Sequence, residues 1–223
     1  MKQSIPCKQG RVAGAIRLLA LAAIVAIAMP LAAARASTPA EDFVQNNVQK
    51  GLTILNSGGT KEQKREDFRN FLLKQTDLKR IADYTLGPVK NSTSPADLAA
   101  FEDAFREYAF AVYESEFTKY SGQTLKVTGS VERKAGDYLV STVLIDPNKS
   151  SDRDPIRVDF RILGTPGRFT VADIIVLGLD LAITEQDDFS AFLAQNNNSV
   201  KALTEELKKR AANVRAGGDL SGK

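Results

Sequence analysis

The sequence contains no histidine, no tryptophan and only one cysteine, Cys7, among its 223 residues. Without histidine the chain has no Ser-His-Asp triad and no Cys-His pair, and most zinc sites lose a usual ligand. One cysteine allows neither an internal disulfide nor a Cys-x-x-Cys site. These absences exclude the commonest hydrolytic and redox chemistries, and we predict no metal, no cofactor and no catalytic residue.

Negative charge is absent from residues 1–36, which carry five lysines and arginines. Within this stretch residues 18–28 form an apolar run, Pro30 comes just after it, and residues 34–36 are Ala-Arg-Ala. A basic stretch, a short apolar run and a small-x-small site are typical of a cleaved secretory signal. The alternative, a membrane anchor, needs about 20 apolar residues. We therefore expect residues 1–36 to be a signal peptide.

Loss of this signal changes the net charge of the protein. The whole chain has a formal charge of +3, and removing five positive charges leaves −2. Nucleic-acid binding depends on a concentrated basic surface, which the mature chain does not have in its composition. We expect one domain over residues 37–216 and a disordered glycine-rich tail over residues 217–223.

The spacing of apolar residues predicts the secondary structure. Helical periodicity indicates helices over residues 42–55, 60–73, 77–86, 94–120, 186–195 and 199–212. A period of two indicates strands near residues 125–131, 138–145, 156–162 and 169–177. Because short turns join these strands, the sheet should be an antiparallel meander. The predicted fold class is α+β, a four-stranded curved sheet with a helical layer on one face enclosing an apolar pocket. The pattern alone does not separate such a pocket from a filled core.

Two acids lie inside apolar strands and are the candidate catalytic bases. A carboxyl group in an apolar cavity has a raised pKa and can accept a proton. Asp159 shares its strand face with Arg157 and Arg161, so we expect it on the wet face of the sheet. Asp173 would serve an isomerase-like enzyme if it lay in a cavity, and otherwise would orient a loop or face solvent.

Seven short stretches resemble a known family, in order, across residues 41–212. They are DLKRIADYTLG at 77–87, FEDAFREY at 101–108, YSGQ at 120–123, VDFR at 158–161, VADIIVLGL at 171–179, DF at 188–189 and VKAL at 200–203. The family is the MlaC, or toluene-tolerance, family of periplasmic phospholipid-binding proteins, with the hopanoid-associated HpnM branch as a close relative. This chain departs from the family pattern at Phe160 and Phe169, where tryptophan is usual, at Leu177 for glutamate, and at Asp187 for arginine.

The resemblance implies a periplasmic carrier that binds phospholipid acyl chains between sheet and helices. Its implied partners are an inner-membrane ABC transporter complex and an outer-membrane lipoprotein complex. A hopanoid or another apolar molecule is the alternative ligand, and a ligand-free interaction module or an isomerase-like enzyme is the alternative function. We predict that eleven side chains line the pocket, with ordinary core as the alternative for each: Phe105, Tyr108, Val112, Val127, Val131, Val140, Val158, Phe160, Ile162, Ile174 and Val176.

Overall fold

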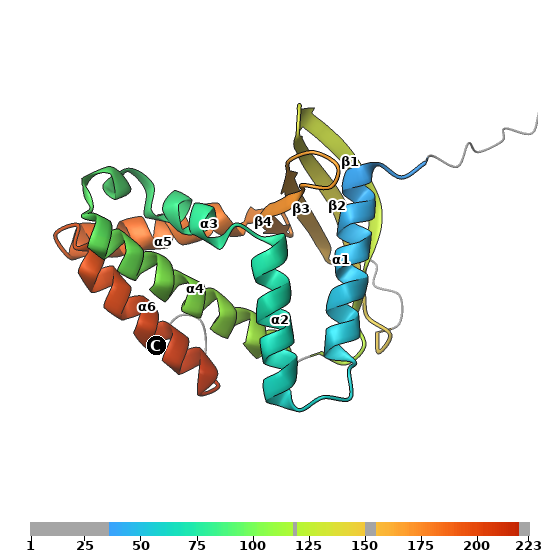
Figure 1. The fold of residues 1–223 in the computed structure, drawn as a ribbon, viewed down its shortest axis with the longest axis horizontal. Helices are drawn as coiled ribbons and strands as arrows, with labels where there is room; N and C mark the ends of the chain where they lie inside the picture. Colours follow the sequence, from blue (N-terminus) through green and yellow to red (C-terminus); the bar gives the residue numbers. More distant parts are fainter. Residues whose placement is uncertain (1–35, 118–119, 150–154, 219–223) are drawn as a thin grey trace, which may run out of the picture. The chain divides into compact units, whose positions relative to one another are not determined.

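The computed structural model describes residues 36–117, 120–149 and 155–218 (Figure 1). The predicted signal peptide, as far as residue 35, and residues 219–223 of the predicted tail lie outside the described residues. Within the described part, no helix is both long and apolar enough to span a bilayer.

The described elements confirm the α+β class. The helices are α1 (Pro39–Leu55), α2 (Lys61–Gln75), α3 (Leu78–Leu86), the 3-10 helix η1 (Gly87–Ser92), α4 (Pro95–Phe117), α5 (Leu181–Gln195) and α6 (Val200–Arg215). The strands are β1 (Thr124–Lys134), β2 (Asp137–Ile145), β3 (Arg157–Leu163), β4 (Thr170–Val176) and β5 (Leu179–Asp180). They pair antiparallel in the order β1-β2-β3-β4-β5, which is the predicted meander with one additional short strand.

Two helices begin earlier than the periodicity indicates, and capping residues explain both. Thr38 and Glu41 form a capping box in front of α1, with Pro39 at the first helical position, so α1 starts before residue 42. The Asp180 carboxylate accepts a hydrogen bond from the Ile183 backbone N–H at 2.8 Å and starts α5 at Leu181, before residue 186.

The fifth strand escapes prediction because it has only two residues. Leu177 and Gly178 form the tight turn that brings Leu179 opposite Val176. Both turn residues have positive φ, 51° and 84°. Glycine and asparagine are the usual residues in such a turn, and leucine at φ 51° is uncommon, so the sequence carries no ordinary hairpin signal there.

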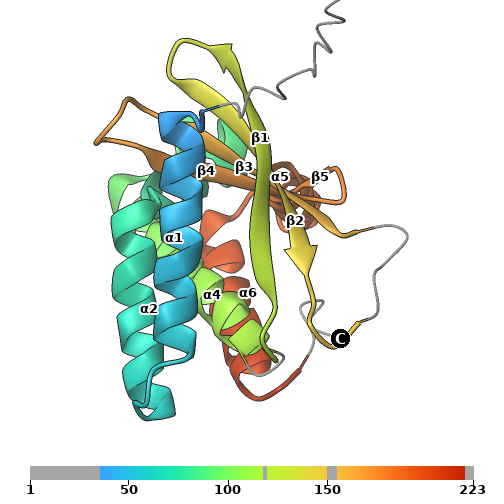
Figure 2. The same cartoon turned by 90° about the vertical axis from the view of Figure 1, so that its right-hand side faces the viewer.

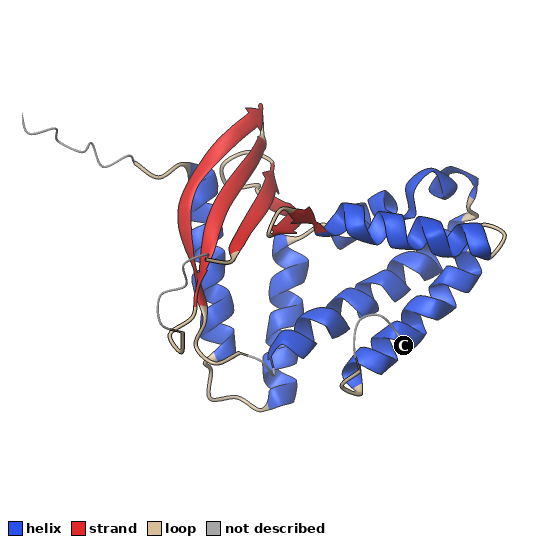
Figure 3. Cartoon of the chain, turned by 180° about the vertical axis from the view of Figure 1, so that it is seen from behind, coloured by secondary structure: helices blue, strands red, loops and turns tan. Residues whose placement is uncertain are grey.

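Two hydrophobic clusters make up the core. The larger joins α3, α4, α5 and α6, where Phe189 meets Phe101 and Phe105 edge-on at 6.1 and 6.3 Å between ring centroids. The smaller packs α1 onto the sheet around Val140 and Ile162. Figures 2 and 3 show this division: α1 lies along β1, while α3 to α6 gather beside the sheet. The helical layer is therefore split, and only part of it covers the sheet face.

On the other face of the sheet two aspartates are buried beneath partly exposed arginines, which corrects one expectation. Asp159 is only 5% exposed, because the Arg157 guanidinium covers it and donates to it at 2.8 and 3.0 Å. Asp137, at the start of β2, is 2% exposed and accepts two hydrogen bonds from Arg161, which hold the pKa of that carboxyl below its usual range. The alternation places Asp159 with the arginines as expected, but the aspartate is buried beneath them rather than wet.

Candidate functional site

A cavity of about 650 Å³ separates the two hydrophobic clusters. Its wall is formed by helices α1 to α5 together with the sheet, and it is mostly apolar. The apolar and aromatic lining residues are Phe43, Val44, Val48, Leu52, Leu55, Phe68, Phe71, Leu72, Ile81, Phe105, Tyr108, Ala109, Val112, Tyr113, Tyr120, Leu125, Leu144, Phe160, Val171, Ile174, Leu181 and Ala182. The volume lies within the range of about 300–1,000 Å³ that is usual for small-molecule sites.

Helical spacing explains how α1 and α2 form one side of this cavity. Val44, Val48 and Leu52 are four residues apart on α1, and Phe68 and Leu72 have the same spacing on α2. Residues at this spacing share one face of a helix, so each helix turns a continuous apolar stripe toward the cavity.

Five of the eleven predicted pocket residues line the cavity. They are Phe105, Tyr108 and Val112 of α4, Phe160 of β3 and Ile174 of β4. Lipid contact by any of the eleven stays a prediction, but these five side chains all line the same cavity.

The other six predicted residues lie elsewhere in the described structure. Val140 and Ile162 are fully buried in the α1–sheet cluster and Val127 is half-buried against it, so α1 covers them. Val131 is 64% exposed near the end of β1, and Val158 and Val176 are half-buried but do not line the cavity.

Sequence reasoning missed the contribution of α1 and α2. Their amphipathic patterns are visible, but periodicity does not say whether an apolar stripe faces another helix, the sheet or an open space.

Two acids, Asp173 and Glu185, are the charged side chains of the cavity wall within the described part of the chain. Asp173 is 7% exposed, and its Oδ1 atom accepts hydrogen bonds from the backbone N–H groups of Ile174 at 2.8 Å and Ala182 at 3.2 Å. These bonds hold the connection from β4 into α5. Burial, followed by the neighbouring Asp180, raises the pKa of Asp173 to about 7. Asp173 therefore orients the loop between β4 and α5 and also lies in the cavity wall, which are two of the three placements expected from the sequence.

Glu185 forms a second polar contact in the cavity wall. The Tyr108 hydroxyl donates a hydrogen bond to its Oε1 atom at 3.3 Å. Burial raises the pKa of Glu185, with the nearby Asp188 adding to the shift. Burial also raises the pKa of Tyr108 far above its usual range, so this phenol keeps its proton and stays a donor.

Asp173 predicts a pH dependence of stability with a defined sign. Its pKa is raised from 3.8 to about 7, so between these values the folded state binds more protons than the unfolded state. Stability contributed by this group is fully present below pH 3.8 and is lost as the pH rises through 7. We expect Asp173→Asn to flatten the fall in unfolding temperature between pH 4 and 7, measured by circular dichroism. Asp187→Asn on the exposed side of α5 is the control, and equal pH profiles for wild type and Asp173→Asn would contradict the expectation.

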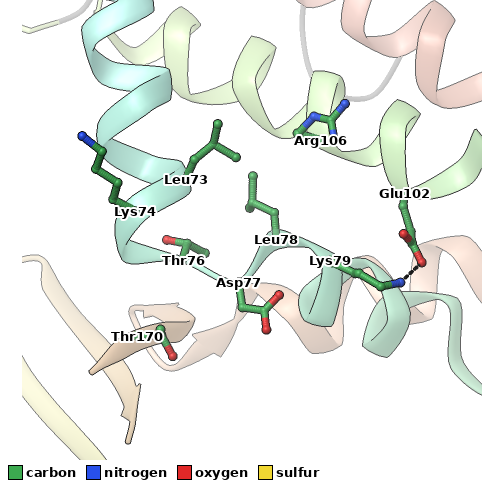
Figure 4. Close-up of a pocket in the computed structure, with 9 residues that line it drawn as sticks. All are labelled: Leu73, Lys74, Thr76, Asp77, Leu78, Lys79, Glu102, Arg106 and Thr170. Carbon is green, nitrogen blue, oxygen red and sulfur yellow. Dashed lines mark hydrogen bonds and ion pairs between the residues drawn. The ribbon is translucent and has the colours of Figure 1, made fainter. Parts of the chain in front are cut away.

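A smaller hollow of about 440 Å³ lies where α2 passes into α3 (Figure 4). Leu73 and Leu78 occupy its centre, and charged side chains surround them. Lys79 is ion-paired with Glu102 there. Thr76 lines both hollows, but the charged rim makes the smaller one unsuited to an apolar ligand. The large cavity is therefore the candidate functional site.

Among the residues that the structure describes, no group of three or more His, Cys, Asp or Glu side chains is arranged to hold a metal ion.

Comparison with known proteins places this geometry in context. Residues 45–209 match the family model for MlaC protein. A solved structure with a similar fold is the phospholipid-binding protein from Ralstonia solanacearum, determined in complex with a phospholipid. The similarity has a TM-score of 0.66 at 20% sequence identity and covers 80% of this chain and 99% of the other. Cavity-lining residues from α1 to α5 fall inside the matched range, with Phe43 and Val44 just before it.

Proposed function

This chain belongs to the MlaC protein family, and from that premise we propose that it is a periplasmic lipid carrier. In this proposal the cavity binds the acyl chains of a phospholipid, and the protein shuttles the lipid between membrane complexes of an ABC-type transport system. The family is one of lipid-binding carriers rather than enzymes, and the proposal requires no catalytic residue.

The apolar cavity between the two hydrophobic clusters is the observation that carries this proposal. Burying one methylene group is worth about 0.8 kcal/mol, so a lipid with roughly 30 methylenes would lose on the order of 20 kcal/mol on entering water. A carrier has to shield the chains from water during transit, and an apolar wall does this without any chemical step.

The structural neighbour supports the choice of ligand. That protein has the same fold and was determined with a phospholipid bound. The lining residues of our chain offer rings and branched aliphatic groups from both clusters, which suit flexible chains. We propose Phe105, Tyr108, Val112, Phe160 and Ile174 as acyl-chain contacts, together with the α1 and α2 stripes.

Export and partners belong to the same proposal. Cleavage after Ala36 would remove only the first residue of the compact unit Ala36–Lys223 and would keep Thr38, the cap of α1. The partners would be an inner-membrane ABC transporter complex and an outer-membrane lipoprotein complex, and a hopanoid is the alternative cargo.

The proposal is tested by purifying the mature protein without detergent and analysing an organic extract by mass spectrometry. We expect about one lipid per protein chain. Reproducible absence of lipid, with unchanged folding, would favour the ligand-free interaction module. Substrate turnover that Asp173→Asn abolishes would favour the enzyme.

A further inference from the structure

The polar groups of the cavity wall differ in kind from those of a phosphate site. Among the described residues that line the large cavity, the charged ones are Asp173 and Glu185, and none is a lysine or an arginine. A buried phosphate would meet repulsion there, because it needs cations or N–H donors. A ligand group that donates hydrogen bonds, whether neutral or cationic, would be attracted by these carboxyl groups.

The two acids line the cavity from consecutive elements, Asp173 from β4 and Glu185 from α5. Asp173 is hydrogen-bonded to the backbone of Ala182, and Glu185 follows Ala182 by three residues on α5. Residues three apart on a helix share a face about one turn apart. Asp173 therefore contacts the first turn of α5, the helix that carries Glu185 one turn further on.

Glu185 retains unused hydrogen-bonding capacity. Its Oε1 atom accepts from Tyr108, whereas its Oε2 atom is shut off from solvent and has no hydrogen-bond partner among the described residues. Within the described part, three buried side-chain polar atoms lack a partner, and two of them belong to cavity-lining residues, Glu185 and Asn47. Both of these atoms are acceptors, and a buried acceptor without a donor is unfavourable. A ligand that supplies a donor would remove this unfavourable state.

We propose that the part of the cavity lined by β4 and α5 is a polar subsite in which Glu185 accepts a hydrogen bond from a hydroxyl or ammonium group of the lipid, with Asp173 as the second acid of the wall. The subsite rests on the proposed lipid carrier function and adds a chemical preference to it. An anionic group, by contrast, stays outside this part of the cavity. Tyr108 is a positioning residue, because its hydroxyl fixes the Glu185 carboxyl on one side.

The test compares three amphiphiles with the same sixteen-carbon chain, hexadecylamine, hexadecanol and palmitate. Each is titrated into lipid-free mature protein at pH 8 to displace a fluorescent fatty-acid probe. We expect the amine and the alcohol to bind about tenfold or more tightly than palmitate, because one hydrogen bond to a charged group is involved. A preference for the amine alone identifies an ammonium ligand, and a shared preference identifies a hydroxyl donor as sufficient.

Two variants connect the preference to the subsite. Glu185→Gln keeps the acceptor for Tyr108 but removes the negative charge, so the amine should lose about tenfold in affinity while palmitate gains. Asp187→Asn removes an exposed acid from the same helix and should change none of the three affinities. Circular dichroism shows whether each variant is folded, and Asp173→Asn replaces Glu185→Gln if that variant does not fold.

The outcomes separate the two proposals. Equal affinity of wild type for the three amphiphiles, unchanged by Glu185→Gln, would overturn the subsite and leave the carrier function standing. Failure of all three to bind the folded protein would overturn the carrier function and the subsite with it.

Discussion

Replacing Ala109 with tryptophan is expected to abolish lipid binding while leaving the protein folded. Ala109 lies on α4 and lines the large cavity. The indole ring would occupy space that the acyl chains need, and we expect lipid recovered from the purified protein to fall by at least about tenfold, or about 1.4 kcal/mol in binding. The measurement is mass spectrometry of the extracted lipid, alongside the unfolding temperature.

The same substitution distinguishes a cavity from a filled core. In a close-packed core an added indole would destabilise the protein by about 1–3 kcal/mol or more, because neighbouring side chains would have to move. Ala100→Trp, on the exposed face of the same helix, is the matched control for helix propensity and tryptophan content. Because the natural chain contains no tryptophan, each variant carries a single fluorophore, and only that of Ala109→Trp should be shielded from aqueous quenchers. Strong destabilisation together with unchanged lipid content would contradict the cavity.

Truncating Phe189 is expected to give the largest loss of stability. Its side chain is fully buried in the helical cluster, where the ring packs edge-on against Phe101 and Phe105. A Phe→Ala change in a packed core costs about 3–5 kcal/mol, since it removes apolar burial and leaves a void. Total stabilities of domains are about 5–15 kcal/mol, so much of the stability would be lost. Urea unfolding followed by circular dichroism measures the difference.

Phe71→Ala is the matched control for this prediction. The Phe71 ring is half-buried and lines the open cavity, so its removal enlarges an existing space and should cost much less stability than Phe189→Ala. It should lower lipid recovery instead, because the α2 stripe loses an aromatic contact. Equal stability losses in the two variants would show that the cavity wall is packed like the core.

The strand pattern was highly informative because it depends on local rules. Alternation of apolar and polar residues, with short turns between, predicted the antiparallel meander from β1 to β4, and the structure confirms it. The two-residue strand β5 was out of reach, since Leu177 forms its turn against the usual preference of that residue. Thr38 and Asp180 are ordinary capping residues and could have indicated the two helix starts. The apolar periodicity begins later than these caps, so it predicted both starts too far along the chain.

The pocket residues show where local rules stop. Phe160 and Ile162 share one face of β3, and the sequence treats them alike. In the structure α1 covers Ile162, whereas Phe160 reaches the cavity. No pattern within β3 distinguishes them, because the difference depends on where α1 crosses the sheet.

By itself the sequence determined the absence of histidine and cysteine chemistry, the α+β class, the order of elements and the resemblance to one family. Each of these follows from residue types or from periodicities of a few residues. Only the tertiary structure decided that the helices divide into two groups, that a cavity lies between the two hydrophobic clusters, and that Asp173 and Glu185 both line it. The physical reason is that a packed core and an open cavity both use the same apolar side chains, and only the distances between the elements that carry them separate the two.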